Sequence, residues 1–381
     1  MYHYLLALTT AWIYKNPSKS LKVIGVTGTK GKSTVIELIN AGLESAGKKT
    51  ILASSIRFKI DDKSKVNETG NTMPGRGFLQ KLMRQGVKAG CEYALLEIVS
   101  EGIVQYRHRF IDFDAAVFVN IHPEHIESHG SFEKYRDAKV KFFKDVDKHT
   151  KNKAKFFVNQ DDPNANYFIE AVDKESVVLS TKTNKQLNLQ GEFNRENAGL
   201  AEAVLRSFGI DEKIIEETFK SFQGVQGRME IIQEEPFKVV VDYAHTPDSL
   251  EAVYQTLKPG SEKLICVLGA AGGGRDKWKR PELGKIAAQY CDTIILTNED
   301  PFDESPSQIL EEIELGIPNE DKKRVQKLID RYQGIERAIS IARPKDTVVI
   351  TGKGSEPYIR IAKGRRLPWS DKGVVKEILG K

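Results

Sequence analysis

The chain has 381 residues, enough for two or three domains with full-sized cores. Apolar residues make up 40% and charged residues 29% of the chain, a composition that excludes disordered and fibrous proteins. Lys and Arg exceed Asp and Glu by only 5 charges, spread along the sequence, so the composition does not favour nucleic-acid binding and is compatible with small anionic substrates.

The N-terminal stretch is apolar for about 14 residues, lacks a basic segment and a cleavage site, and is too short to cross a bilayer. We therefore expect no transmembrane segment. Residues 1–20 are predicted to hold a packed apolar helix closed by the breaker Asn16-Pro17-Ser18. A segment that lies at an interface or docks a partner is the alternative.

Cysteine usage indicates the compartment. Cys91, Cys266 and Cys291 lie far apart in apolar stretches and form neither a CxxC pair nor an even disulfide framework. We expect a reducing, cytoplasmic environment.

Apolar runs alternate with helical patterns along the chain, which favours α/β architecture with parallel sheets. A β-rich run over Leu21–Val26 enters a glycine-containing turn, and a helical pattern follows through Val35 and Leu43. The later strands expected in the first half are Tyr93–Ile98, Ala115–Val119, Phe156–Asn159 and Ser176–Leu179. The second half is predicted to contain strands Val239–Val241, Leu264–Leu268, Thr293–Thr297 and Thr347–Thr351, and helices Pro247–Leu257, Arg280–Tyr290 and Ser307–Glu314.

The turn-rich segment Gln223–Gly227 lies between these two periodic regions. We predict a P-loop-type ATP-binding domain with a mainly parallel sheet over residues 21–222. A Rossmann-like α/β domain is predicted over residues 223–381.

The glycine-containing turn is the strongest local signal for chemistry. Backbone N–H groups of such a turn wrap phosphate oxygens, while Lys32 can reach the β- and γ-phosphates and Ser33 can ligate Mg²⁺. The candidate nucleotide-binding residues are Gly28, Thr29, Lys30, Gly31, Lys32, Ser33 and Thr34. A simple structural turn is the alternative, but strand, turn and helix occur in the required order. The spacing GxxGKS is shorter than that of the ordinary P-loop and is typical of one ligase superfamily.

Acidic and histidine residues follow later strands. Glu97 lies at the end of a predicted strand, where open α/β sheets bind ligands, and is a candidate metal ligand. Three of the seven histidines fall within residues 122–129. A zinc site is one alternative, but no cysteine and no HExxH spacing accompanies these histidines. A purely structural histidine cluster is a further alternative.

Ordered motifs along most of the chain resemble the Mur ligase family, most of all its UDP-N-acetylmuramoyl-tripeptide synthetase branch. They are GVTGTKGKST, NTMPGRGFLQ, LEIVSEG, NIHPEHIESHG, YRDAK, GEFNRENA, QGRME, VVDYAHTPDSLEAV, GAAGGGRDKWKRP, TNEDPFDESP and TGKGSEPY.

The resemblance implies an ATP-dependent enzyme that activates a carboxylate as an acyl phosphate, which an amine attacks to give an amide, ADP and phosphate. It implies that Lys32 and Ser33 hold phosphates and one Mg²⁺, with Glu97 as another ligand of that ion. His125 would help to hold a second Mg²⁺. Lys139 stands where the family's lysine is carbamylated to serve the second metal; an unmodified surface lysine is the alternative.

Further roles carried over from the resemblance concern the nucleotide. Asn194 and Asn197 resemble the adenine-side asparagines of the family, although a helix cap would also explain them. Arg228 and Asp242 match residues that reach the phosphates and the ribose, with His245 beside them.

The C-terminal motifs are expected to select the amino acid. Arg275 matches an arginine for the α-carboxylate, and Gly352 and Glu356 match further contacts to the amino acid. Phe302 replaces the arginine that binds the distal carboxylate of diaminopimelate, so a basic amino acid such as lysine is predicted to bind the acidic stretch containing Glu299 and Asp300. A solvated acidic loop is the alternative.

Departures from the family concern the acceptor. Only about 20 residues precede the first strand, whereas the family normally has an N-terminal domain that holds the UDP moiety. Thr72 and Ser100 are candidate contacts to a UDP-muramoyl-peptide-like acceptor. Met73 replaces the second threonine of the family's Thr-Thr-Pro segment.

Two other functions are alternatives to this one: a cyanophycin-like or polyglutamate-type ligase, and a non-catalytic ATP-binding subunit. We expect a monomer or weak oligomer, with partner docking at the N-terminal helix as an option.

Overall fold

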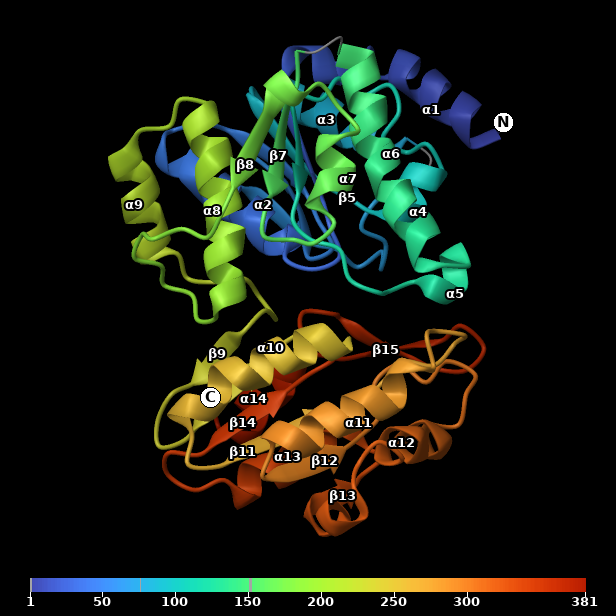
Figure 1. Ribbon diagram of the computed structural model, residues 1–381, viewed down its shortest axis with the longest axis vertical. Helices are drawn as coiled ribbons and strands as arrows, with labels where there is room; N and C mark the ends of the chain where they lie inside the picture. Colours follow the sequence, from blue (N-terminus) through green and yellow to red (C-terminus); the bar gives the residue numbers. More distant parts are fainter. Residues whose placement is uncertain (1, 76, 151–152) are drawn as a thin grey trace. The chain divides into compact units, whose positions relative to one another are not determined.

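The computed structural model describes residues 2–75, 77–150 and 153–381. The chain divides into two compact units, Met1–Gln223 and Gly224–Lys381, and each is described by itself (Figure 1).

The first unit is built on an eight-stranded sheet with the order β4-β3-β2-β5-β1-β6-β7-β8. Strands β2, β5, β1, β6, β7 and β8 run parallel, and β3 and β4 are antiparallel additions at one edge. The strands are β1 Lys22–Thr27, β2 Thr50–Ala53, β3 Arg57–Ile60, β4 Lys63–Val66, β5 Tyr93–Ile98, β6 Ala115–Phe118, β7 Lys155–Asn159 and β8 Val177–Ser180.

Helices cover both faces of this sheet (Figure 1). The helices are α1 Tyr2–Ile13, α2 Lys32–Ser45, α3 Phe78–Lys88, α4 Ser100–Val104, α5 Ile126–His129, α6 Phe132–Thr150, α7 Ala165–Ile169, α8 Glu192–Ser207 and α9 Glu212–Ser221, with short 3-10 turns η1 Pro17–Ser20 and η2 Lys174–Ser176. Two separate apolar cores result, one on each face. Helices α2, α8 and α9 close one core, and α3, α6 and α7 close the other.

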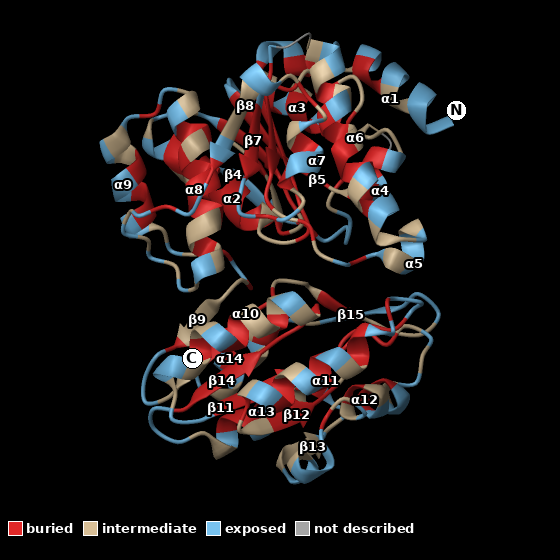
Figure 2. Cartoon of the chain, viewed as in Figure 1, coloured by how far each residue is buried: buried red, intermediate tan, exposed pale blue. Residues whose placement is uncertain are grey.

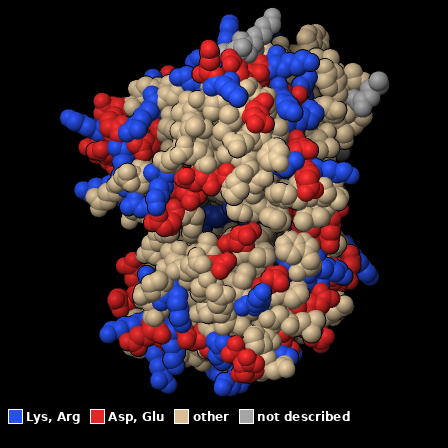
Figure 3. Space-filling model, viewed as in Figure 1, with Lys and Arg blue, Asp and Glu red and all other residues tan. Residues whose placement is uncertain are grey.

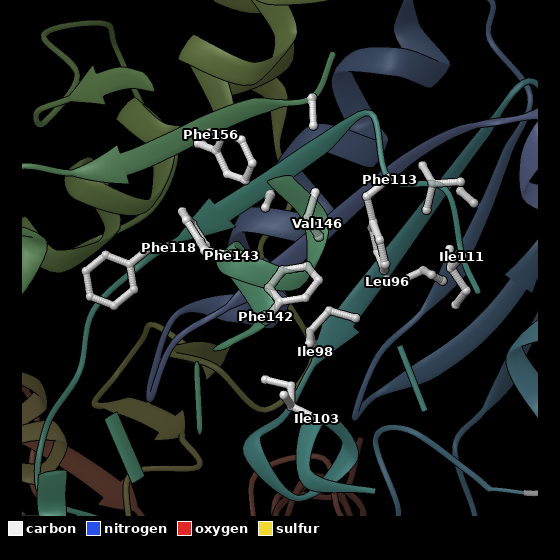
Figure 4. Packing of buried hydrophobic residues seen from close by; sticks show 14 of the residues in the cluster. Leu96, Ile98, Ile103, Ile111, Phe113, Phe118, Phe142, Phe143, Val146 and Phe156 are labelled. Atoms are coloured by element: carbon white, nitrogen blue, oxygen red, sulfur yellow. The ribbon is translucent and has the colours of Figure 1, made fainter. Parts of the chain in front are cut away.

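Aromatic packing fixes helix α6 against the sheet (Figure 4). Phe142 and Phe143 are fully buried, and Phe142 lies edge-on to Phe113 with ring centroids 5.1 Å apart. Phe118 stacks on Phe168 at 3.7 Å. Phe142 and Phe143 thus anchor the middle of α6, the part of the helix that also carries Lys139, against the sheet.

Helix α1 packs less than predicted. Only Thr10 and Ala11 are buried, while Trp12 and Ile13 are 77% and 59% exposed. The apolar face of α1 is therefore mostly open to solvent, and partner docking there stays a prediction.

The second unit contains a six-stranded sheet with the order β13-β12-β11-β14-β10-β9. It is parallel except for β9 at one edge, and β15 and β16 form a separate antiparallel hairpin. The strands are β9 Glu230–Gln233, β10 Lys238–Val241, β11 Leu264–Leu268, β12 Thr293–Leu296, β13 Val325–Lys327, β14 Thr347–Ile350, β15 Tyr358–Arg360 and β16 Arg366–Pro368.

The helices of this unit again form two layers, with α10, α11 and α12 against one core and α13 and α14 against the other. They are α10 Pro247–Leu257, α11 Lys279–Tyr290, α12 Pro306–Glu314, α13 Arg331–Ile341 and α14 Asp371–Ile378, with 3-10 turns η3 Lys258–Gly260 and η4 Asn319–Arg324. The central strands and inner faces of the helices are the buried parts of both units (Figure 2).

Two large, mainly parallel sheets confirm the predicted α/β fold class. The predicted strands correspond to β1, β5, β6, β7, β8, β10, β11, β12 and β14, and β2, β3, β4, β9, β13, β15 and β16 are additional. Among the described residues, no helix combines the length and the apolar character that crossing a membrane requires.

Candidate nucleotide and amino-acid sites

The glycine-containing turn joins the carboxyl end of β1 to the amino end of α2. Gly31 occupies the N-cap position with φ +77°, and no side chain caps the helix. The first N–H groups of α2 are consequently available to a ligand, and the helix dipole favours an anion there. Lys32 Nζ lies 2.8 Å from the carbonyl oxygen of Thr29, to which it donates, and 3.8 Å from Glu97 Oε1.

A hydroxyl and a carboxylate meet beside this turn. Ser33 Oγ donates to Glu97 Oε2 at 3.1 Å, and the backbone N–H of Ser55 donates to the same oxygen at 2.9 Å. Strands β1 and β5 are neighbours, with Val26 in register with Glu97, so the sheet fixes this pair. Oxygen ligands of this kind suit Mg²⁺ that also binds phosphates and water. Within the described ranges no group of three or more His, Cys, Asp or Glu residues could enclose a metal by itself.

Lys139 reaches the same turn from α6. Its side chain is 2% exposed, and Nζ donates to the carbonyl oxygen of Gly28 at 2.8 Å. Burial, reinforced by the charge of Lys32, holds the pKa of Lys139 well below its ordinary value. The alternative of a surface lysine is therefore wrong.

An aromatic side chain lies between Lys139 and the histidine segment. Tyr135 is 2% exposed, its hydroxyl is 3.1 Å from Thr29 Oγ1, and Lys139 Nζ lies 4.8 Å from its ring centroid. The His125 ring lies 5.7 Å from that of Tyr135, and burial lowers the pKa of His125. A neutral imidazole is the form that binds metals. Sequence reasoning quoted the YRDAK motif but did not single out Tyr135.

The two asparagines lie at the start of α8, and both are 4% exposed. Gly191 takes the N-cap position, so neither asparagine caps this helix. Asn197 lies against the nucleotide turn: a Cβ atom added at Gly31 would stand 2.2 Å from Asn197 Oδ1. Asn194 donates from Nδ2 to the Gln190 carbonyl oxygen at 2.7 Å.

The candidate acceptor residues flank a second network in the first unit. Ser100 Oγ lies 3.1 Å from His129 Nε2, and Thr72 is half-buried in the segment before α3. Arg107 donates to Asn71 Oδ1 at 3.3 Å, to the Met73 carbonyl oxygen and to Gln105 Oε1. Arg107 thereby holds the segment that contains Thr72.

A cavity of about 400 Å³ adjoins this network. Its walls are one face of α1, residues 74–75 and 77–80, and residues Gln105, Arg107 and Arg109. Sequence reasoning missed Gln105 and Arg107. Their signal was the polar and basic pattern QYRHR directly after the LEIVSEG motif.

Arg228, Asp242 and His245 belong to the second unit. Asp242 accepts from the backbone N–H groups of Met229 and Ala244, both at 2.6 Å. The guanidinium of Arg228 lies 4.2 Å from the ring centroid of Tyr243, and the His245 ring is 4.5 Å from the same ring. The structure thus brings these three predicted residues together around Tyr243.

The predicted acidic stretch is largely neutralised by the chain itself. Asp300 accepts from Lys353 Nζ at 2.7 Å and from the backbone N–H of Arg360 at 2.8 Å. Glu304 pairs with Arg280 at 3.0 Å. Asp300 is 5% exposed, which also contradicts a solvated loop. The stretch is therefore not the open cation site from which a basic amino acid was predicted.

Glu299 is the exception within the stretch. It is 6% exposed, burial raises its pKa, and Oε2 has no hydrogen-bond partner among the described residues. A Cβ at Gly352 would stand 2.4 Å from that oxygen, so Gly352, with φ +105°, permits the close approach. Glu356 lies beside Lys353, whose Nζ is 2.5 Å from Glu356 Oε2.

Comparisons with known proteins match both units to domains of Mur ligases. The Mur ligase middle domain matches residues 26–217, and the Mur ligase, glutamate ligase domain matches residues 227–354. A UDP-N-acetylmuramoyl-L-alanyl-D-glutamate–2,6-diaminopimelate ligase of Syntrophomonas wolfei is 35% identical, over 98% of this chain and 81% of the relative. A UDP-N-acetylmuramyl-tripeptide synthetase of Treponema denticola is 35% identical over 98% and 79%.

Solved structures agree on the fold. A UDP-N-acetylmuramoyl-L-alanyl-D-glutamate–2,6-diaminopimelate ligase has a TM-score of 0.62 and 28% identity, over 94% of this chain and 78% of that chain. A folylpolyglutamate synthase of Mycobacterium tuberculosis has a TM-score of 0.75 at 16% identity, over 99% and 95%, which shows the shared fold alone. The chain belongs to the Mur ligase family and is an ATP-dependent ligase that joins an amino acid to a carboxylic acid.

Proposed function

We propose that this ligase adds one amino acid to a UDP-muramoyl-peptide-like acceptor in peptidoglycan precursor synthesis. The observation that carries the proposal is the convergence of Lys32, Ser33, Glu97 and Lys139 on one phosphate-binding turn. A sensor that only binds ATP has little need of a buried lysine beside that turn. The names of the relatives support the acceptor class.

In the proposed reaction an oxygen of the acceptor carboxylate attacks the γ-phosphorus of ATP, and ADP leaves. The amine of the amino acid then attacks the acyl carbon, phosphate leaves, and the nitrogen loses a proton. Lys32 and the backbone N–H groups of the turn stabilise charge on the transferring phosphoryl group. Arg228 of the second unit is proposed to bind phosphate as well, as the resemblance implies.

Ser33 and Glu97 would hold one Mg²⁺, and His125 would help to hold a second. The ions supply neutralisation of phosphate charge when they are bound. The oxygen and imidazole donors present fit this demand.

Lys139 is proposed to carry a carbamate. Its lowered pKa keeps part of the amine neutral, and the neutral amine is the form that attacks CO₂, forming an N–C bond and releasing one proton. The product is an anion, which would replace a positive charge that repels Mg²⁺. Mass spectrometry does not preserve such a labile group reliably, so dependence of turnover on bicarbonate is the better test.

The cavity beside Arg107 is the proposed place for part of the acceptor. Its volume of about 400 Å³ suits a sugar or a short peptide. Arg107 would favour an anionic group, whereas Arg109 is paired with Asp145 at 2.9 Å. Thr72 and Ser100 remain proposed hydroxyl contacts to the acceptor. We propose a cytoplasmic location, because the reaction consumes ATP.

The experiment that tests this function measures ADP formation with ATP, Mg²⁺, an acceptor and single amino acids. Wild type and Lys139→Ala are compared, with Lys144→Ala as the matched control, because Lys144 is exposed on the same helix. Acceptor-dependent ADP formation that is strongly reduced in Lys139→Ala and retained in Lys144→Ala supports the proposal. ATP binding without turnover for any acceptor and amino acid would contradict it.

A further inference from the structure

A buried arginine lies behind the predicted amino-acid contacts of the second unit. Arg331 is the first residue of α13, and its side chain is only 1% exposed. A guanidinium group carries five N–H donors, and removing them from water is costly unless they find acceptors. The acceptors that Arg331 finds therefore show which parts of the unit it holds together.

Arg331 binds the carbonyl groups that follow two different strands. Nη1 donates to the Asn298 carbonyl oxygen at 3.1 Å, and Nη2 donates to the Thr351 carbonyl oxygen at 2.8 Å. Asn298 follows β12 and Thr351 follows β14, and β11 lies between these two strands in the sheet. Strands two positions apart are separated by about 9–10 Å, so their backbones do not bond to each other. The guanidinium group joins their carboxyl ends instead.

Asp371 fixes the orientation of this guanidinium group. Its two carboxylate oxygens accept from Arg331 Nε and Nη2, both at 2.8 Å, which makes a bidentate pair. The Asp371 side chain is fully buried in the first turn of α14, where the helix dipole favours a negative charge, and it also accepts from Trp369 Nε1 at 2.7 Å. The pair therefore connects α14 to the carboxyl ends of β12 and β14.

The two carbonyl groups immediately precede residues predicted to contact the amino acid. Asn298 precedes Glu299, and Thr351 precedes Gly352. Glu299 and Gly352 are packed closely, since a Cβ atom added at Gly352 would stand 2.4 Å from Glu299 Oε2. The separation of the two strand ends thus sets the positions of both predicted contacts, and Arg331 sets that separation.

We propose that Arg331 is a positioning residue for the amino-acid site. It holds the ends of β12 and β14 at the separation that lets Glu299 and Gly352 contact the incoming amino acid, and Asp371 holds Arg331 in place. Neither member of the pair touches the substrate. This inference rests on the proposed function, to which the contacts of Glu299 and Gly352 with the amino acid belong.

The test compares Arg331→Lys with wild type in steady-state kinetics of the full chain, with meso-diaminopimelate and L-lysine as amino acids. Lysine keeps the positive charge but does not reproduce the planar fork that binds two carbonyl groups and a carboxylate. For the amino acid that wild type uses, kcat/KM should fall about 10- to 100-fold, the effect of losing one charged hydrogen bond. The KM values for ATP and acceptor should stay unchanged. Asp371→Asn should give a smaller loss of the same kind, because an amide oxygen still accepts one hydrogen bond.

Arg324→Lys is the matched control. Arg324 also binds two carbonyl groups and a carboxylate, namely the carbonyl oxygens of Cys291 and, at 3.0 Å, of Ala288, and the side chain of Asp321 at 2.6 Å. Cys291 comes before β12, so this arginine lies at the amino end of the strand, away from the predicted contacts. Arg324→Lys should lower the unfolding temperature without changing any KM.

Amide hydrogen exchange followed by mass spectrometry tests the pair without turnover. Residues 298–302 and 351–356 should exchange faster in Arg331→Lys than in wild type, because local opening no longer breaks the bonds of the guanidinium group. The same residues should exchange at the wild-type rate in Arg324→Lys. A general loss of stability would instead speed exchange in both variants.

Three results would overturn the inference while leaving the ligase activity intact. They are an equal loss of kcat/KM for ATP, acceptor and amino acid in Arg331→Lys, the same loss for the amino acid in Arg324→Lys, and wild-type exchange at both strand ends in Arg331→Lys. If Arg331→Lys does not fold, Asp371→Asn takes its place in each comparison. Absence of wild-type turnover with every amino acid would instead remove the proposed function, and hydrogen exchange would then still show whether Arg331 holds the two strand ends.

Discussion

A methyl group added at Gly31 tests whether the turn before α2 binds the nucleotide as its geometry implies. Gly31 has φ +77°, and its added Cβ would stand 2.2 Å from Asn197 Oδ1 and 3.0 Å from Val119 Cγ1. Gly47 offers a matched control with φ +75° and no atom within 4 Å of the added Cβ. Both alanine variants have the same backbone strain, and only Gly31→Ala has the clash.

The backbone strain sets the expected loss of stability, and the clash sets the expected loss of ATP affinity. A left-handed conformation costs an L-residue about 1–2 kcal/mol, so both variants should unfold at a lower temperature than wild type. In Gly31→Ala the Asn197 amide and the turn must also move apart. Loss of one charged hydrogen bond from the turn to phosphate costs about 1.5–3 kcal/mol, or about 10- to 100-fold in ATP affinity.

Calorimetric titration of ATP with Mg²⁺ into the three proteins measures this difference, and thermal unfolding measures the strain. We expect Gly47→Ala to bind ATP as wild type does and Gly31→Ala to bind it at least tenfold more weakly. The reasoning is refuted if Gly31→Ala keeps wild-type affinity, or if Gly47→Ala loses as much affinity as Gly31→Ala.

Three further predictions concern single side chains. Lys139→Ala should reduce turnover about 10²- to 10³-fold, with partial rescue by millimolar acetate or chloride; unchanged kinetics would exclude a role at the metal site. Asp371→Ala leaves Arg331, 1% exposed and bonded to Asp371 at 2.8 Å, as a buried unpaired charge, so chemical denaturation of the second unit should show a loss of about 3–5 kcal/mol. Lys372→Ala, which removes a half-exposed ion pair to Glu230, should cost less than about 1 kcal/mol. Burial lowers the pKa of His108 below 6.5, so its contribution to stability is present above pH 6.5 and is lost as the pH falls through its folded pKa. Thermal midpoints measured from pH 7.5 to 5 should therefore fall less steeply for His108→Gln than for wild type, and equal slopes would contradict this.

The central strands were predictable because parallel strands covered on both faces are continuous apolar runs. Strands β3 and β4 are not apolar runs of this kind. Only one residue of β3 is buried, and all four residues of β4 are exposed at the sheet edge. Strand β13 is only three residues long and has no fully buried residue. Edge strands of this kind are held by backbone pairing, which sequence patterns do not reveal.

The glycine-containing turn between β1 and α2 was predictable because its residues are contiguous and its spacing is specific. Lys139 was recognised through resemblance, but its burial and its bond to the Gly28 carbonyl depend on the packing of α6 against the sheet. The individual roles of the candidate site residues stay proposals.

The ion pairing of the acidic stretch could not be predicted from the sequence, and the basic amino acid inferred from that stretch stays a prediction. Lys353 and Arg360 lie more than 50 positions from Asp300 in the chain, and only the fold brings them to it. A run of acidic letters therefore said nothing about the cations that neutralise it. On the face of the molecule drawn in Figure 3, acidic and basic side chains are intermixed, and no continuous basic area is visible.

The central claim is tested most directly by mass spectrometry of the product formed from ATP, Mg²⁺ and UDP-N-acetylmuramoyl-dipeptide with single amino acids. We predict ADP and phosphate in equal amounts and an acceptor mass increased by one amino-acid residue. Measurable ATP binding with no change in acceptor mass for any amino acid would contradict the assignment of this acceptor and this reaction.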